Sequence, residues 1–288
     1  MNKTTAPSIN DAIIGSSGEV INPNGTKARG IENAQIKKIA ERYNVTSRTV
    51  EITALDLGVV PHRYLRNIGS IGIGGQIKLR KSRVAVVGLG GLGGGVARAL
   101  ARVGVGELVL IDYDVFSESN LNRQEFSYEK NLGRSKVREA VSEIGEINSS
   151  VGLFPVEERV DETGFIKSLK GAAVVVDALD TISSRFALER AAKRLGIPLI
   201  HGSIAGFSGQ VSVIFPEDAG FRKIYGSEPS LPDRGVEVFL GNLPGVVGVV
   251  SSLEAVEVIK IITGIGETLR NKLLFIDAEN GFFEILDL

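Results

Sequence analysis

Hydrophobic positions along the chain form short runs that alternate with amphipathic stretches from residue 83 onward. Runs rich in Val, Ile and Leu predict strands at 84–87, 107–111, 152–156, 172–176, 198–201, 210–215, 273–276 and 282–286. The stretches between them predict helices at 96–103, 134–147, 165–169, 185–195 and 246–262. Strands that alternate with helices are typical of a mostly parallel sheet covered by helices on both faces. We therefore predict an α/β, Rossmann-like domain over residues 61–288.

Residues 1–60 have a different pattern, and we predict that they form a small N-terminal helical extension. The first thirty residues are expected to be weakly structured, with a turn at 22–25. Residues 36–58 predict a helical hairpin that resembles a helix-turn-helix, with Ala40, Val45 and Val50 at its packing positions and Thr46 or Ser47 as the cap of its second helix. Its small surplus of basic residues favours a packing role over DNA reading. Residues 63–78 are expected to link this hairpin to the main domain.

Composition narrows the classes of function. The 33 Lys and Arg residues and 34 Asp and Glu residues give a net charge of −1, which argues against nucleic acid or a membrane surface as the partner. No signal peptide and no uncharged apolar stretch of about 18 residues is visible, so we expect a cytoplasmic protein. The chain has no cysteine, which excludes disulfides, thiolate zinc sites and a cysteine nucleophile. Acid–base and electrostatic roles must therefore be carried mainly by Asp, Glu, Lys and Arg.

A glycine-rich loop is the first candidate binding site. The segment V-A-V-V-G-L-G-G-L-G-G-G contains G-x-G-x-x-G as Gly88, Gly90 and Gly93, after a predicted strand and before a predicted helix. Gly88 permits a tight turn, Gly90 lets the backbone approach phosphate, and Gly93 lets the helix pack on the strand. Asp112 ends the next predicted strand, where it can accept hydrogen bonds from ribose hydroxyls. These features predict a nucleotide site, for which a nicotinamide or flavin dinucleotide is the default ligand.

The residues after Asp112 favour a triphosphate instead. The run I-D-Y-D-V-F-S-E-S-N-L-N-R-Q at 111–124 and G-R-S-K at 133–136 place an Arg and a Lys beside the ribose end. Hydride transfer has no use for these two cations, whereas cleavage of a triphosphate develops charge on phosphoryl oxygens that they can stabilise. An NAD(P)-binding oxidoreductase and a non-catalytic binding or regulatory protein stay open as alternatives.

Taken in order, the motifs resemble those of the ThiF/MoeB/HesA family. The series includes the glycine loop, the 111–124 run, the Lys of G-R-S-K, V-D-A-L-D at 176–180, S-I-A-G-F-S-G-Q-V-S-V at 203–213 and the helix at 245–260. Members of this family are bacterial relatives of ubiquitin-activating enzymes, and they adenylate the C-terminal glycine of a small ubiquitin-like sulfur carrier. The resemblance implies an ATP-dependent adenylyltransferase that uses Mg²⁺, works as a homodimer, and acts on a carrier protein ending in Gly-Gly.

The resemblance also implies a role for individual residues. The phosphate loop and its surroundings are expected to bind ATP through Gly88, Gly90, Gly91, Gly93, Asp112, Asp114 and Asn120. The catalytic residues are expected to be Arg123, Lys136, Asp180 and Arg66. Asp180 would hold Mg²⁺, Asp114 could orient the loop or assist the metal, and Arg66 would enter the partner's ATP site as an arginine finger.

Three further residues are weaker candidates for a role in the same site. Asp177 is the rival to Asp180, although it is expected to be a buried carboxylate at the end of a strand. Arg185 is expected either to brace Asp180 or to face solvent, and His201 is expected to be a structural histidine rather than a base.

The chain departs from the family in its lack of thiols. Many members hold a structural zinc with two C-x-x-C pairs and carry a further cysteine for sulfur transfer, but residues 221–241 contain none of these. We therefore expect no zinc, apolar packing in its place, and no thioester step on this chain. Adenylation itself needs no thiol. Adenylation of a small-molecule or tRNA-linked carboxylate remains an alternative, and the carrier and the pathway stay open.

Overall fold

The computed structural model of the protein describes residues 7–21, 25–227 and 234–288, so residues 22–24 of the predicted turn at 22–25 lie outside the described residues. Its core is an eight-stranded sheet with the order β11-β10-β9-β8-β7-β4-β5-β6. Pairing is parallel from β6 to β8 and antiparallel from β8 to β11. The strands are β4 Arg83–Val87, β5 Glu107–Ile111, β6 Gly152–Val156, β7 Val174–Asp177, β8 Leu199–Ala205, β9 Ser208–Ile214, β10 Lys272–Asp277 and β11 Phe282–Asp287.

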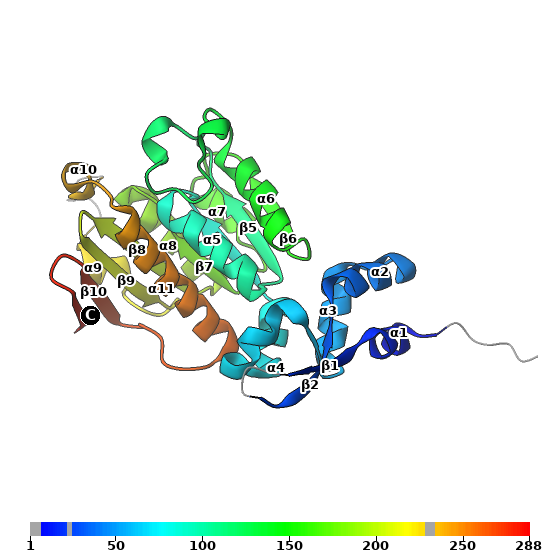
Figure 1. Cartoon of the computed structure of the whole chain (residues 1–288). Helices are drawn as coiled ribbons and strands as arrows, with labels where there is room; N and C mark the ends of the chain where they lie inside the picture. Colours follow the sequence, from blue (N-terminus) through cyan, green and yellow to red (C-terminus); the bar gives the residue numbers. More distant parts are fainter. Residues whose placement is uncertain (1–6, 22–24, 228–233) are drawn as a thin grey trace, which may run out of the picture.

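Helices cover both faces of this sheet (Figure 1). One face packs against α4 Leu65–Lys81, α5 Gly91–Val103, α6 Lys136–Ile147 and α11 Pro244–Thr263. The other packs against α7 Glu162–Ser168, α8 Ile182–Leu195 and α9 Phe221–Tyr225. A short helix, α10 Glu237–Leu240, and the 3-10 turns η1 His62–Tyr64, η2 Glu118–Asn120 and η3 Glu129–Asn131 lie in the connections. The predicted α/β, Rossmann-like fold is confirmed.

The central strands are mostly apolar because both of their sides are buried. In β4, Val84 and Val86 join the cluster under α5 and α11, whereas Ala85 and Val87 join the cluster under α7 and α8. This alternation follows the two-residue period of a strand. Within the ranges that the structure describes, no helix is long and apolar enough to cross a membrane.

Residues 7–21 and 25–61 form a module, which we name the N-terminal module, and the expectation of a weakly structured start was wrong for its described residues. Residues 1–6, which this expectation also covered, lie outside the described residues. Ser8 and Asp11 form a capping box at the first helix, and Ile13 and Ile31 are buried with residues of the helical hairpin. The elements before residue 32 are short and mix apolar with polar residues, so they do not stand out in the sequence, and they are stabilised by packing between elements. The elements are α1 Ile9–Ser16, β1 Gly18–Ile21, β2 Lys27–Ile31, α2 Asn33–Tyr43, α3 Ser47–Asp56 and β3 Val59–Pro61.

The predicted helical hairpin is present as α2 and α3. Asn44 ends α2 in the left-handed conformation, with φ 51°, and the Thr46 side chain caps α3 by accepting the N–H of Thr49. However, α3 packs against α4, and Arg48 on this face donates to the Arg80 carbonyl at 3.0 Å. That face of α3 is buried in the protein and is therefore not presented to a DNA groove, which agrees with a packing role.

The segment at 63–78, expected to be a linker, belongs mainly to helix α4. Its glycines hide the helical pattern, and Gly72, with φ 66° and ψ 174°, kinks the helix where it occurs. Beyond the kink, Gln76, Leu79 and Arg80 are buried, so this helix is a structural part of the main domain.

A buried polar network joins the N-terminal module to the main domain. The side chains of Glu51 and Arg80 are fully buried and form an ion pair at 2.9 Å. Glu51 also accepts hydrogen bonds from the Tyr64 hydroxyl at 3.3 Å and the Ser150 hydroxyl at 2.9 Å, while Arg80 donates to the Ser150 carbonyl at 2.9 Å. Because the two charges compensate each other away from water, removal of either one leaves the other unpaired.

Replacement Arg80→Met should therefore lower the free energy of unfolding by about 3–5 kcal/mol, because Glu51 would be left as an uncompensated buried carboxylate. Urea denaturation followed by circular dichroism measures this loss. The matched control is Lys81→Ala, since the pair of Lys81 with Asp56 is about half exposed, at 54% and 50%. The control should change stability by less than about 1 kcal/mol. Equal effects of the two variants would contradict a buried junction.

Candidate functional site

The turn between β4 and α5 brings backbone against backbone. Gly88 has φ +90°, and a Cβ on it would lie 2.5 Å from the Ala178 carbonyl oxygen. A Cβ on Gly93 would lie 1.8 Å from the Gly88 carbonyl oxygen. No side chain fits at either position, so the sequence requires glycine at both.

The start of α5 presents backbone N–H donors to the pocket beside it. Gly90 is the N-cap and supplies no side-chain hydrogen bond, so the first-turn N–H groups of the helix are not capped. A Cβ on Gly90 would meet only the Gln124 amide nitrogen, at 3.6 Å, which leaves the approach to these donors open. Uncapped N–H groups and the helix dipole together favour an anion such as phosphate. The cradle therefore fits the phosphates of a nucleotide.

Asp112 ties this loop to the end of β5. One carboxylate oxygen accepts the Leu89 N–H at 2.6 Å, and the other accepts the Asp114 N–H at 2.9 Å. The side chain is 9% exposed and lines the pocket. Each oxygen keeps a further lone pair, so Asp112 can hold the loop and still accept a ribose hydroxyl.

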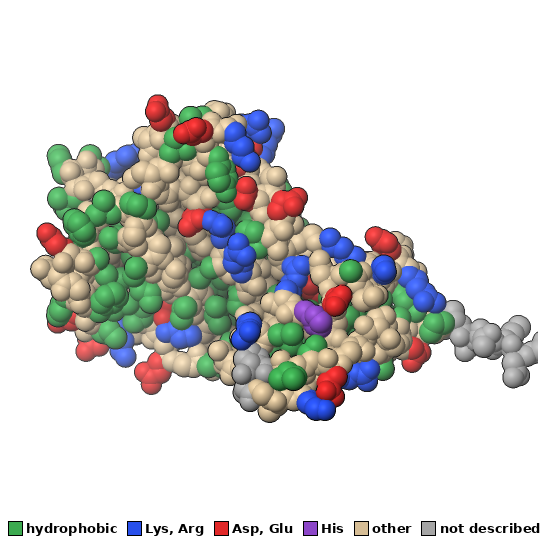
Figure 2. Space-filling model, in the orientation of Figure 1, with side chains coloured by type: hydrophobic (Ala, Val, Ile, Leu, Met, Phe, Trp, Pro, Cys, Tyr) green, Lys and Arg blue, Asp and Glu red, His purple; other side chains and the backbone are tan. Residues whose placement is uncertain are grey.

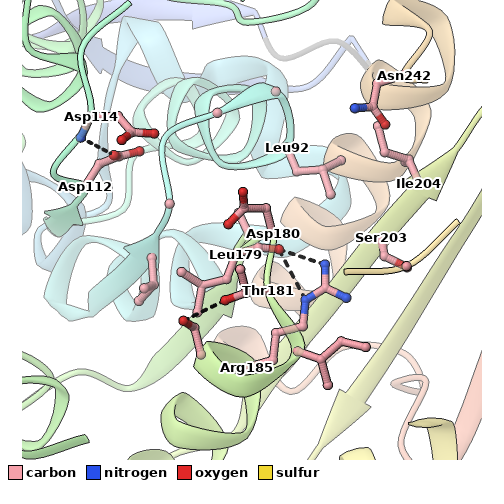
Figure 3. Close-up of a pocket in the computed structure, with 18 of the residues that line it drawn as sticks. Leu92, Asp112, Asp114, Leu179, Asp180, Thr181, Arg185, Ser203, Ile204 and Asn242 are labelled. Carbon is pink, nitrogen blue, oxygen red and sulfur yellow. Dashed lines mark hydrogen bonds between the residues drawn. The ribbon is translucent and has the colours of Figure 1, made fainter. Parts of the chain in front are cut away.

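A single pocket of about 590 Å³ joins the glycine loop to the ends of β5, β7 and β8. Figure 3 shows Asp112 and Asp114 on one side of it and Asp180, Arg185 and Ser203 on another. Nine of the residues expected in the site line this pocket, namely Gly88, Gly90, Gly91, Asp112, Asp114, Asn120, Arg123, Lys136 and Asp180. Gly93 lies behind the loop as a packing residue.

The two predicted cations differ in how they are held. Lys136 is almost buried and its Nζ lies 3.0 Å from an Asp114 carboxylate oxygen. Arg123 donates to the Ser119 carbonyl and to the Asn122 side chain, both at 2.8 Å, but forms no ion pair with any residue in the described ranges. Partial burial lowers the pKa of Arg123. The Arg123 guanidinium is therefore a pocket charge that no carboxylate of the described chain neutralises.

Asp180 follows β7 in the loop before α8. Its side chain is 71% exposed and lies 3.1 Å from the Arg234 guanidinium. Its rival Asp177 is fully buried and bonded to His201 at 2.9 Å, as expected of a strand-end carboxylate. The described part of the chain has no cluster of three or more His, Cys, Asp or Glu side chains that could hold a metal ion by itself. A metal at Asp180 would need oxygen ligands from the nucleotide, which is the usual arrangement for Mg²⁺.

Arg66 lies outside this pocket. It is exposed on α4 and makes no hydrogen bond or ion pair with the residues that the structure describes. Within one chain it therefore does not reach the nucleotide site.

Several pocket residues were not predicted from the sequence. Gln124 is 7% exposed, and its side-chain carbonyl oxygen has no hydrogen-bond partner. It follows Arg123 directly, so its place in the same motif was an available signal. Tyr225 and Gln210 also line the pocket, but no local pattern marks them, because they reach it from α9 and β9.

The region where relatives hold zinc has apolar packing at its start. Phe221 is fully buried and stacks edge-on against Phe186 and His201, with ring centroids 5.7 and 5.0 Å apart. Further along, Val238, Phe239 and Leu240 of α10 are exposed. Apolar packing was therefore correctly expected around α9 but not around α10.

The glycine cradle, the Asp112 carboxylate and a pocket with Arg123 and Lys136 at the carboxyl ends of the strands define an α/β nucleotide-binding protein. The ThiF family model matches residues 64–288. The chain belongs to the ThiF family, and the resemblance drawn from the motifs is confirmed.

Curated relatives share this part of the chain. The chain is 40% identical over 227 residues to the SAMP-activating enzyme E1 of Haloferax volcanii, covering 77% of this chain and 83% of the relative. It is 37% identical over 225 residues to the probable adenylyltransferase/sulfurtransferase MoeZ of Mycobacterium tuberculosis, covering 75% of this chain and 57% of MoeZ. It is 34% identical over 236 residues to the adenylyltransferase and sulfurtransferase MOCS3 of Mus musculus, covering 78% of this chain and 50% of MOCS3. The predicted enzyme class, an adenylyltransferase, agrees with these relatives.

Two solved structures have a similar fold. The crystal structure of PaaA has a TM-score of 0.67 at 19% identity, and the match covers 95% of this chain and 98% of PaaA. The crystal structure of E. coli MccB with ATP has a TM-score of 0.68 at 25% identity and covers 78% of this chain and 71% of MccB. The PaaA match extends over the N-terminal module as well, whereas the family model begins at residue 64.

The glycine contact generates a test of the cradle. Gly93→Ala should destabilise the protein by about 1–3 kcal/mol or more and abolish ATP binding, because its methyl group would displace the Gly88 carbonyl. Isothermal titration calorimetry with ATP measures the binding. Gly94→Ala is the matched control, because its nearest neighbour, Cδ2 of Phe126, lies at 3.5 Å. ATP binding by both variants, or loss in both, would show that the Gly88–Gly93 contact does not shape the site.

Proposed function

We propose that the protein is an ATP-dependent adenylyltransferase that activates the C-terminal carboxylate of a ubiquitin-like carrier protein ending in Gly-Gly. A carboxylate oxygen attacks the α-phosphorus of ATP, the bond to the β-phosphate oxygen breaks, and an acyl-adenylate and pyrophosphate form. The observation that carries the proposal is one pocket that contains the glycine cradle, Asp112, Arg123, Lys136 and Asp180. The name of the Haloferax relative, a SAMP-activating enzyme, supports a protein substrate.

The pocket cations suit the charge that develops during this reaction. Arg123 has no carboxylate partner in the described ranges, so it can bind phosphate oxygens without breaking an ion pair. Lys136 is held by Asp114 at 3.0 Å, which fixes its ammonium group beside the ribose end. Asn120 is held by the Ser117 N–H at 3.0 Å and lines the same pocket. Donors fixed before the reaction stabilise a transition state more effectively than donors that must reorganise.

Asp180 fits a role as a magnesium ligand. Its carboxylate lines the pocket and is largely exposed, and the triphosphate would supply the remaining oxygens. Asp180 would hold Mg²⁺, whose charge would offset the negative charge of the phosphates. Only Oδ2 of Asp180 contacts the Arg234 guanidinium, which leaves Oδ1 for a ligand.

The reaction on this chain ends at the acyl-adenylate. The chain contains no cysteine, so it can form no thioester, and a separate sulfur donor would have to attack the activated carboxylate. The chain spans about half the length of the relatives whose names include sulfurtransferase.

An apolar surface beside the pocket opening suits the body of a carrier protein. Gly235, Val236 and Asn242 line the pocket, and the residues between them continue onto exposed α10. Figure 2 shows hydrophobic side chains gathered over the end of the sheet where α10, β10 and β11 lie. An exposed apolar patch of this kind is typical of a protein-binding surface. The exposed members around α10 are Phe207, Val236, Val238, Phe239, Leu240 and Leu243.

The proposal includes a homodimer in which Arg66 completes the partner's site. Arg66 is exposed, unpaired within the described residues and absent from the lining of its own pocket, so a role in catalysis requires a second chain. An exposed arginine without a partner costs little to move into an interface, where it can approach phosphate.

A peptide carboxylate is the second candidate substrate. The fold similarity to PaaA extends over 95% of the chain, including the N-terminal module that the family model leaves out. The solved MccB structures include one with MccA, and for this reason we retain a peptide as the second candidate substrate. The relatives give no support to a small-molecule or tRNA-linked carboxylate or to an NAD(P)-dependent oxidoreductase.

ATP–pyrophosphate exchange tests the proposed reaction. Wild type should catalyse exchange with one of the organism's small proteins ending in Gly-Gly or, under the second candidate, with a peptide. Arg123→Ala and Asp180→Ala should each lower the exchange rate by about 100-fold or more at unchanged melting temperature, because each removes charge stabilisation. Arg138→Ala is the control, since Arg138 is 77% exposed and pairs with Glu157. Absence of exchange with every substrate, together with tight NAD binding, would overturn the proposal.

Mixing of two inactive variants tests Arg66. Arg66→Ala and Asp180→Ala homodimers should each be inactive, but a mixed dimer contains one site with both residues intact. An equimolar mixture that exchanges subunits freely should therefore recover about one quarter of wild-type activity. Native mass spectrometry would verify that mixed dimers form. Mixed dimers without recovered activity would exclude Arg66 as a residue supplied by the partner.

A further inference from the structure

Four side chains form a hydrogen-bonded chain beneath the loop that carries Asp180, and we name them the buried relay: Asp177, His201, Tyr225 and Arg185. Asp177 at the end of β7 and His201 in β8 are fully buried. An Asp177 carboxylate oxygen lies 2.9 Å from Nδ1 of His201, and Nε2 of His201 lies 2.9 Å from the Tyr225 hydroxyl. Nη1 of Arg185 then donates to the Tyr225 hydroxyl. The relay joins β7, β8, α9 and α8.

The direction of each hydrogen bond in the relay follows from the state of His201. Burial lowers the pKa of His201, which keeps its imidazole neutral. Nδ1–H then donates to Asp177, so Nε2 must accept the Tyr225 O–H. The Tyr225 oxygen accepts from Arg185 and from the Gln210 amide at 3.3 Å. Its donor and both acceptor positions are therefore occupied within the protein, although Tyr225 lines the pocket.

The relay ends on the backbone of Leu179, the residue before Asp180. Nε and Nη2 of Arg185 donate to the Leu179 carbonyl at 3.2 and 2.7 Å, as Figure 3 shows. The Leu179 N–H donates to the other oxygen of Asp177 at 3.1 Å. Both polar groups of Leu179 are thus bound by relay members, whereas the Asp180 side chain has only its exposed contact with Arg234 in the described chain.

The charges of the described residues around the relay are balanced. Arg185 lies 3.6 Å from Asp177, which is the buried carboxylate that compensates it. Glu254 of α11 is fully buried nearby, and a Cβ on Gly202 would lie 2.5 Å from its carboxyl carbon. Burial, and then the charge of Asp177, raise the pKa of Glu254 well above its usual range, so it is neutral and does not compete for Arg185. Among the residues that the structure describes, the cluster therefore contains one cation and one anion.

We propose that Asp177, His201, Tyr225 and Arg185 are positioning residues that fix the Leu179 peptide and thereby direct the Asp180 carboxylate at the metal of the metal–ATP complex. The inference rests on the proposed function, since it takes Asp180 as the magnesium ligand. A largely exposed carboxylate on a loop is directed mainly by its backbone, because no side-chain contact inside the fold orients it. One of the two sequence expectations was that Arg185 braces Asp180. Instead, Arg185 acts through the Leu179 carbonyl and does not bind the Asp180 carboxylate.

Affinity for Mn²⁺ in the presence of a saturating non-hydrolysable ATP analogue tests this role, measured by electron paramagnetic resonance of free Mn²⁺. Tyr225→Phe keeps the ring and removes the oxygen that Arg185 binds. It should weaken Mn²⁺ binding about tenfold, as removal of groups that orient a metal ligand commonly does. Affinity for the ATP analogue without metal should stay the same, because the glycine cradle is untouched.

Variants at His201 separate the hydrogen bond from the packing. His201→Gln retains an acceptor for the Tyr225 hydroxyl and should bind Mn²⁺ more tightly than His201→Leu, which retains none. Phe221→Leu is the matched control, because Phe221 packs 5.0 Å from the His201 ring and takes no part in the hydrogen bonds. The control should lower the melting temperature without a change in Mn²⁺ affinity.

Asp180→Ala separates failure of this inference from failure of the proposed function. If Asp180→Ala weakens Mn²⁺ binding but Tyr225→Phe and His201→Leu do not, the relay is structural only and the positioning role is overturned. If Asp180→Ala leaves Mn²⁺ affinity unchanged, the metal assignment in the proposed function fails, and the positioning role fails with it.

Discussion

The close approach of α5 to β4 at Gly93 and Gly88 is the contact on which the site depends. A Cβ on Gly93 would lie 1.8 Å from the Gly88 carbonyl, and one on Gly88 would lie 2.5 Å from the Ala178 carbonyl. Three segments therefore meet without side chains between them: the end of β4, the start of α5 and the loop after β7. The same meeting point brings the helix donors, the ribose-type carboxylate Asp112 and the Asp180 loop to one edge of the sheet. The site is therefore a consequence of backbone packing that only glycine permits.

Buried charges and pocket charges differ in how they are paired. Glu51 with Arg80, and Asp177 with Arg185 and His201, are buried and compensated by partners within the fold. Arg123 has no carboxylate partner in the described ranges, and Asp180 has an exposed partner. Buried charges must be paired for stability, whereas an unpaired or exposed charge in the pocket can bind a ligand at little cost. Lys136 is the exception in the pocket, because Asp114 pairs with it. This contrast distinguishes the pocket from the junction with the N-terminal module, although both are polar.

The fold of the main domain and most of the pocket could be predicted because their signals are local in the sequence. Strands buried on both faces appear as apolar runs, and the glycine loop, the 111–124 run and V-D-A-L-D each lie in one short segment. The N-terminal strands, the kinked helix α4 and the relay residue Tyr225 were not predictable in this way. The N-terminal strands, GEVI and KARGI, mix polar residues and glycine with apolar ones, α4 is rich in glycine, and Tyr225 meets His201 only through the pairing of distant elements. These features depend on tertiary contacts that no single segment encodes.

The central claim is that a substrate carboxylate attacks the α-phosphorus of ATP in this pocket. The most direct measurement follows oxygen-18 from a labelled C-terminal carboxylate of the substrate that supports exchange. After the activated product is cleaved at its carbonyl by hydroxylamine, the released AMP should carry the label, because the bridging oxygen of an acyl-adenylate comes from the carboxylate. AMP without oxygen-18, or release of ADP in place of AMP, would contradict the account.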